Sequence, residues 1–167
     1  YERAANLEPR HPAYRWSLLG FHALAPRLVG GERAEALRQA EVLAGLDEME
    51  GRIARATLAL LDKSPEAAFA EFEAVLRERP DDPSALYHFG RCADLARTRQ
   101  HEGIAALERC LQLPPPPDAD ASTLALVHHR LGNLWAQVGD HARAAAAHAA
   151  ATRAQPDFNL AKLQLRR

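Results

Sequence analysis

Apolar residues recur along the chain at the three- and four-residue spacing of a helix face, in segments that come in pairs. Three of the first segments share one arrangement: Trp16-x2-Leu19-Gly20-x2-Ala23, Leu86-x2-Phe89-Gly90-x2-Ala93 and His128-x2-Leu131-Gly132-x2-Trp135. The second segments share another: Ala36-x3-Ala40-x2-Leu43, Ala68-x3-Phe72-x2-Val75, Gly103-x3-Leu107-x2-Cys110 and Ala144-x3-His148-x2-Ala151. Self-similarity at a period of about 34 residues predicts an array of helical hairpins.

Prolines, glycines and capping residues mark where these helices begin and end. Pro12 suits a first helical turn and Pro26 ends the same segment, so we expect a helix from 12 to about 25. Gly30-Gly31 then reverses the chain, and a partner helix is expected from 32 to 44. Asp82-Pro83 repeats the device of a cap followed by proline at the helix start.

The pattern predicts an all-α fold and one repeat domain over residues 1–167. The expected parts are a partial repeat at 1–10, repeats at 13–47, 48–81, 83–115 and 124–157, a proline-rich insertion at 114–121 and a capping helix at 157–167. The first half of 48–81 carries the weakest signal, because it lacks the glycine and the large aromatic residue. The chain starts inside a repeat and without methionine, so we interpret it as a fragment of a longer protein.

Composition narrows the function classes. The net charge is -1, with 21 basic and 22 acidic residues, so no excess of cations is present to neutralise nucleic-acid phosphates. Apolar runs of about 18 residues are absent, and no insertion into a membrane is expected. The abundance of alanine and arginine is typical of a GC-rich bacterial genome, and we expect a cytoplasmic protein. Cys92 and Cys110 lack a CxxC spacing and are interpreted as small buried side chains.

Candidate catalytic and metal-binding chemistry is weak. His128, His129, His141 and His148 invite a zinc interpretation, but adjacent residues on a helix point about 100 degrees apart, so His128 and His129 are poorly placed to share one ion. Packing is the favoured role for His128 and His148. No nucleophile elbow or phosphate-binding loop is present. The sequence therefore predicts no catalytic site, no metal and no cofactor.

The paired segments resemble the tetratricopeptide repeat (TPR) family. The resemblance is strongest over 124–157 and weakest in the first half of 48–81, and it departs from the family pattern at 25–31, at the insertion and at His148. It implies a right-handed superhelical solenoid of antiparallel helix hairpins. It also implies that Gly20, Gly90 and Gly132 let the paired helices approach closely, and that the first helices line a concave surface holding peptides or partner proteins.

Candidate partner-binding residues are the first-helix positions that hairpin packing does not use. These are Tyr14, Ser17, Phe21, Ile53, Thr57, Tyr87, Arg91, Asp94, His129, Asn133 and Gln137. Aromatic, polar and cationic side chains of this kind dominate peptide interfaces. The alternative is that several of them pack against neighbours or face water. Some family members clamp a carboxyl terminus, but Arg91, Arg130 and Asn133 supply only pieces of such a clamp, so we do not predict that ligand.

The favoured function is a non-catalytic scaffold that binds a protein or peptide in the concave groove. An alternative is the substrate-docking or regulatory region of a larger enzyme, for example a transferase, whose catalytic domain lies outside these residues. Self-association through uncapped repeat ends is a further possibility. All three interpretations use surfaces of the repeat and no active site.

Overall fold

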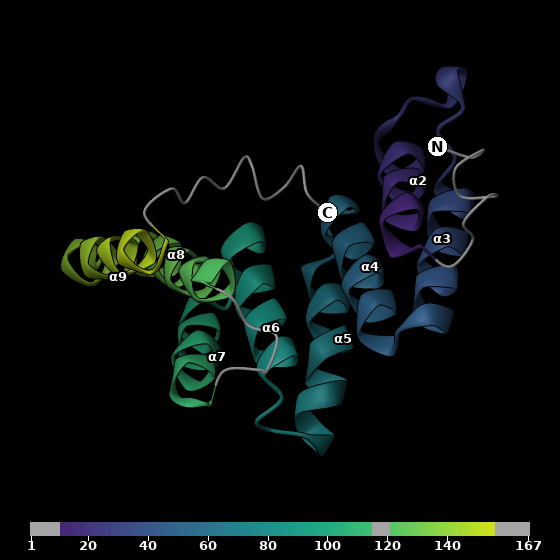
Figure 1. Ribbon diagram of the computed structural model, residues 1–167. Coiled ribbons are helices and arrows are strands. Elements are labelled where there is room, and N and C mark those ends of the chain that lie inside the picture. Colours follow the sequence, from purple (N-terminus) through teal and green to yellow (C-terminus); the bar gives the residue numbers. More distant parts are fainter. Residues whose placement is uncertain (1–10, 115–120, 156–167) are drawn as a thin grey trace. The chain divides into compact units, whose positions relative to one another are not determined.

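The computed structural model describes residues 11–114 and 121–155. Within these ranges the chain forms eight α-helices and one short 3-10 helix, with no strand, so the all-α prediction is confirmed for this part (Figure 1). The expected partial repeat at 1–10, the capping helix at 157–167 and most of the insertion at 114–121 lie outside the described residues. No helix of the described part is both long and apolar enough to cross a membrane.

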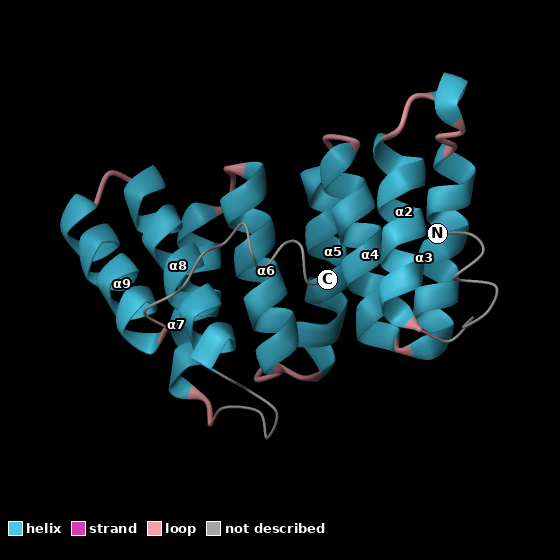
Figure 2. Cartoon of the chain, turned by 45° about the horizontal axis from the view of Figure 1, so that its top comes forward, coloured by secondary structure: helices cyan, strands magenta, loops and turns pink. Residues whose placement is uncertain are grey.

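The chain divides into two compact units, with the boundary between Glu71 and Phe72 inside helix α5 (Pro65–Glu78). Unit 1 contains α2 (Pro12–Leu24), the 3-10 helix η1 (Arg27–Val29), α3 (Arg33–Leu46) and α4 (Glu48–Leu61). Unit 2 contains α6 (Pro83–Ala96), α7 (Gln100–Gln112), α8 (Ala121–Gln137) and α9 (His141–Ala154). Figure 2 shows that short loops join most successive helices.

Unit 1 is held together by small and branched side chains between α2, α3 and α4. Each helix contacts the next, and α2 also contacts α4. The core consists of Leu19, Ala36, Ala40, Leu43, Ala54 and Leu58, with Trp16 and Ala23 packed against it. The indole nitrogen of Trp16 donates a hydrogen bond to Glu50 Oε2 at 2.6 Å. The helix α4, which has the weakest sequence signal, is thus anchored to α2 by both apolar and polar contacts.

The connection between α2 and α3 contains η1 and two glycines. Gly30 ends η1 in the left-handed conformation, with φ of 94°. A Cβ atom on Gly31 would lie 1.8 Å from the carbonyl oxygen of Ala25, so only glycine fits there. The reversal predicted from Gly30-Gly31 is confirmed, and the 3-10 turn before it was not predicted.

Unit 2 repeats the same scheme with larger side chains. α6 contacts α7 and α8, α7 contacts α8, and α8 contacts α9. Phe72 of α5 stacks on His88 of α6 with ring centroids 5.4 Å apart. Asp82 caps α6 by accepting from the backbone nitrogen of Ala85 at 2.9 Å, as its sequence position predicts. α6 and α8 each contact α7, and they also contact each other. Residues of these two first helices therefore lie on one side of the unit.

Close helix approach occurs at some expected glycines and not at others. A Cβ on Gly90 would lie 2.4 Å from the Leu107 side chain, and one on Gly132 would lie 2.6 Å from the His148 ring. Nothing lies within 4 Å of the corresponding position at Gly20, so the expectation of close approach there is wrong. Instead, Gly51 meets Ala44 at 2.3 Å and Gly103 meets Ala93 at 2.4 Å. Unit 1 therefore places its close contact between α3 and α4.

A candidate binding hollow between α6 and α8

Four of the predicted binding residues meet where α6 and α8 lie together. Asp94 comes from the last turns of α6, and His129, Asn133 and Gln137 follow one another at four-residue spacing on α8. Four-residue spacing keeps side chains on one helix face, so α8 presents a polar row to Asp94. The structure thus brings together residues that lie 35 to 43 positions apart in the chain.

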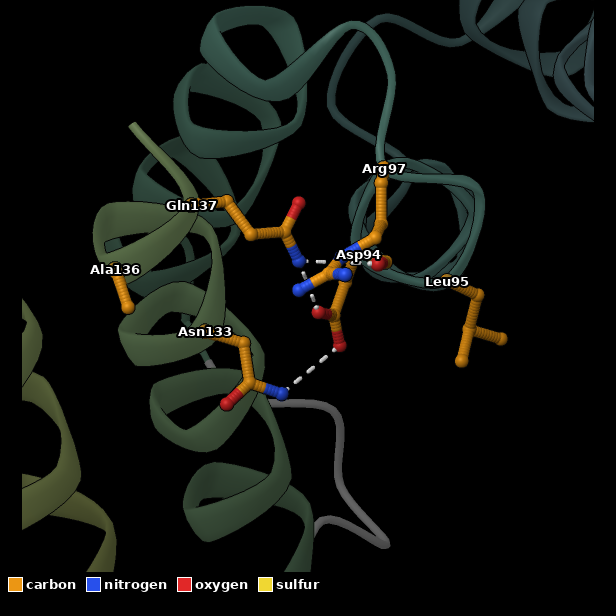
Figure 3. A pocket seen from close by; sticks show the side chains of 6 residues that line it. All are labelled: Asp94, Leu95, Arg97, Asn133, Ala136 and Gln137. Carbon is orange, nitrogen blue, oxygen red and sulfur yellow. Dashed lines mark hydrogen bonds between the residues drawn. The ribbon is translucent and has the colours of Figure 1, made fainter. Parts of the chain in front are cut away.

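Asp94 is the centre of this cluster. Its side chain Oδ2 accepts hydrogen bonds from Arg130 Nη1 at 2.7 Å and from Asn133 Nδ2 at 3.1 Å. Gln137 Nε2 donates to Asp94 Oδ1 at 2.9 Å and to its carbonyl oxygen at 3.1 Å (Figure 3). Asp94 and Arg130 are each only 7% exposed, and an ion pair so deeply buried requires this set of partners.

His129 extends the cluster towards α9. Its Nε2 lies 3.3 Å from Asn133 Nδ2, and its ring centroid lies 5.4 Å from that of His148. Burial, with added repulsion from Arg130 and His148 that outweighs the attraction of Asp94, lowers the pKa of His129. Burial, followed by Arg153, lowers the pKa of the adjacent His128. The neutral imidazole is therefore favoured at both positions.

A shallow hollow of about 400 Å³ opens beside Asp94. Its lining residues are Asp94, Leu95, Arg97, Asn133, Ala136 and Gln137 (Figure 3). Leu95 is 48% exposed, and Ala136 is also exposed, so the hollow has an apolar rim around a polar floor. A volume of this size accommodates one or two amino-acid side chains.

His129 and the remaining predicted residues do not line this hollow. On α6, Tyr87 packs edge-on against His88 at 4.9 Å, and Arg91 is half-buried. On α2, Ser17 Oγ donates to the carbonyl oxygen of Ala13 at 2.9 Å, and Tyr14 lies beside His11 with ring centroids 4.6 Å apart. Both tyrosine side chains remain partly exposed.

Two further predicted residues lie on α4, and one more lies on α2. Ile53 is only 8% exposed and is part of the buried core of unit 1, so the expectation that packing leaves it free for a ligand is wrong. Thr57 is half-buried, and its Oγ1 makes no hydrogen bond within the described residues. Phe21 is 40% exposed at the end of α2, where its ring lies 3.8 Å from a Cβ built on Gly30.

Four residues of the site were not among the predicted binding residues: Leu95, Arg97, Arg130 and Ala136. Arg130 lies three positions before Asn133 and seven before Gln137, so helical spacing alone places it on the same face of α8. Leu95 and Arg97 lie at the end of α6, and Arg97 has left-handed backbone geometry with φ of 55°. The period of the helix gives no signal for residues at such an end.

Neither a metal site nor a similarity to known proteins assigns a function to this site. Among the described residues, no group of three or more histidine, cysteine, aspartate or glutamate side chains is placed to hold a metal ion. No known protein family model matches the chain. No curated protein sequence matches it either.

Proposed function

We propose that this chain is a non-catalytic interaction module that binds an extended peptide segment of a partner protein at the hollow between α6 and α8. The observation that carries the proposal is the pair of amide side chains, Asn133 and Gln137, which line the hollow and are held in place by hydrogen bonds to Asp94. A preorganised pair of this kind lowers the entropy cost of binding.

The nitrogen and oxygen atoms of the two amide side chains have different roles. The nitrogens of Asn133 and Gln137 are committed to Asp94, so their carbonyl oxygens are the groups left for a ligand. Peptide backbone N–H groups are donors that match these acceptors. Leu95 and Ala136 supply apolar surface at the rim for a neighbouring side chain. The hollow therefore suits a polypeptide better than a compact metabolite.

The proposal also places the chain among TPR-type right-handed superhelical repeats. Its support is the recurrence within each unit of one packing scheme, in which a helix contacts both its successor and the next first helix. The glycine contacts at Gly90 and Gly132 support the same assignment. In such an architecture α6 and α8 are both first helices, and their shared surface is the one proposed to bind ligand.

A displayed library of random dodecamer peptides, selected on the immobilised chain, tests the function. Peptides that are enriched are then titrated by calorimetry against the wild-type chain and an Asn133→Ala, Gln137→Ala variant. Loss of two hydrogen bonds, each about 0.5–1.5 kcal/mol, predicts binding weaker by roughly tenfold or more.

Glu108→Ala, at an exposed position of α7, is the matched control and should leave binding unchanged. Far-ultraviolet circular dichroism should show that all three proteins keep their helix content. Equal affinity of the double variant and the wild type, or the absence of any enriched peptide, would contradict the proposed site.

A further inference from the structure

The hollow carries a surplus positive charge. The carboxylate of Asp94 is paired with Arg130 at 2.7 Å, so these two groups cancel. Arg97 also lines the hollow and is exposed, and its guanidinium makes no hydrogen bond or ion pair within the described residues. One uncompensated cation therefore remains at the rim.

We propose that this hollow accepts an acidic side chain, aspartate or glutamate, from within the bound peptide, with the Arg97 guanidinium as its ionic partner. The inference rests on the proposed peptide-binding function and specifies the ligand. Arginine presents a planar set of donors that matches a carboxylate in two parallel hydrogen bonds.

A second observation indicates where the peptide backbone lies. Gln137 Oε1 is buried and has no hydrogen-bond partner within the described residues. The amide cannot simply be reversed, because its nitrogen faces two acceptors of Asp94, at 2.9 and 3.1 Å. In Figure 3 this oxygen points away from Asp94. A buried acceptor without a donor is costly, and a peptide N–H would satisfy it.

A cationic ligand fits the hollow poorly. It would face the Arg97 guanidinium, and the Asp94 carboxylate already accepts hydrogen bonds from Arg130, Asn133 and Gln137. A new cation would therefore meet repulsion without gaining a free carboxylate. An anion next to a backbone N–H satisfies both Arg97 and Gln137.

The selected dodecamers test the inference directly. Acidic residues should be enriched in them, and resynthesis with Asp→Asn or Glu→Gln should weaken binding to the wild-type chain by roughly tenfold. Arg97→Gln should weaken binding of the acidic peptide by a similar factor. When Arg97→Gln is combined with the neutralised peptide, the affinity should fall little further, because both changes remove the same ion pair. Arg97→Lys should retain part of the affinity, because the charge remains.

Salt provides an independent measurement. Raising the ionic strength from about 0.05 M to about 0.5 M should weaken the wild-type complex markedly and the Arg97→Gln complex little, because the ion pair lies at an exposed rim. Arg77→Gln, at an exposed arginine near the end of α5, is the matched control and should behave as wild type.

Each peptide is prepared with a free and with an amidated carboxyl terminus. If only the free terminus supports binding, the anion is the terminal carboxylate and the inference is wrong. Selected peptides without acidic residues, or full affinity of Arg97→Gln, would also overturn the inference. In that case, loss of binding in the Asn133→Ala, Gln137→Ala variant would still support the proposed function. A library that yields no binder overturns both.

Discussion

Single residues at the α6–α8 contact show how a charged group is retained inside an otherwise apolar fold. Asp94 is buried, yet each of its side-chain oxygens accepts at least one hydrogen bond. Removing one member of a buried ion pair is far more damaging than removing an exposed one, because the other charge stays unpaired. Asp94 therefore has a positioning role, in which it fixes the orientation of the Asn133 and Gln137 side chains.

The histidines beside this cluster predict a pH-dependent stability. The folded chain lowers the pKa of His128 and His129 from the ordinary value of 6.5, chiefly by burial. The unfolded chain then binds more protons as the pH falls below about 6.5, so the free energy of unfolding decreases there. We expect a loss of a few tenths to about 1 kcal/mol between pH 7.5 and pH 5.5, because solvent still screens these partly exposed rings.

Thermal unfolding followed by circular dichroism at the two pH values measures this loss. His128→Gln and His129→Gln should each reduce the shift in midpoint, whereas His101→Gln, at an exposed position of α7, should not. A flat profile for the wild-type chain, or the same shift in all variants, would show that these histidines do not carry the effect.

At the scale of helices, the close contact between α3 and α4 predicts opposite effects for two glycines of unit 1. A Cβ on Gly51 would lie 2.3 Å from Ala44 Cβ and 2.5 Å from Ala44 Cα, so Gly51→Ala must push the backbones apart and should cost about 1–3 kcal/mol. Gly20 has free space around its Cα, and Gly20→Ala should stabilise α2 by about 0.5–1 kcal/mol.

Urea unfolding of the three proteins measures both changes in one experiment. Gly45→Ala is a second control, because it also has no neighbour within 4 Å. A destabilising Gly20→Ala would indicate a packing partner for α2 at that position, and a neutral Gly51→Ala would indicate that α3 and α4 can separate without loss.

Local signals in the sequence predicted the helices better than their contacts. Asp82 and Pro83 determine the start of α6 through side-chain capping and a fixed φ. The position of this helix start could therefore be predicted without knowledge of the tertiary contacts. Gly20 and Gly90 occupy the same motif position, yet only Gly90 faces a close neighbour. The difference arises from which residue the adjacent helix places opposite, and the motif does not contain that information.

The candidate site divides in the same way. Asp94, Asn133 and Gln137 were predicted as first-helix positions that hairpin packing does not use. Asn133 and Gln137 are half-buried, but Asp94 is buried and its carboxylate is taken up by Arg130, Asn133 and Gln137, so the expectation that packing leaves Asp94 free is wrong. Arg97 was not, because it lies after the last turn of α6, where backbone geometry rather than period sets its direction. Ile53 was predicted to be accessible and is buried, because its segment lacks the glycine and the large aromatic residue that mark the packing positions in the other first helices.

For the whole molecule, the important property is that contacts are local to two compact units. Each unit contains one of the two tryptophans. Trp16 of α2 is hydrogen-bonded to Glu50, and Trp135 of α8 lies beneath the Arg143 guanidinium, 3.8 Å from the ring centroid. In chains with mainly neighbouring contacts, regions can differ in stability and open separately. The tryptophans therefore report on different units.

This arrangement predicts that a destabilising substitution acts mostly within its own unit. Trp135→Phe leaves Trp16 as the reporter of unit 1, and Trp16→Phe leaves Trp135 as the reporter of unit 2. Gly51→Ala should lower the urea midpoint of the Trp16 signal more than that of the Trp135 signal. Asp94→Ala should do the reverse, with a loss of about 3–5 kcal/mol in unit 2 from the unpaired Arg130.

Each midpoint shift is measured against the parent that carries the same tryptophan substitution, so the cost of replacing tryptophan cancels. If Gly51→Ala lowers mainly the Trp16 midpoint and Asp94→Ala lowers mainly the Trp135 midpoint, the two units unfold with separate cooperativity. The α6–α8 hollow can then be altered without disturbing α2–α4. Equal shifts in both backgrounds would mean that the continuous helix α5, which both units share, couples them into one unfolding transition.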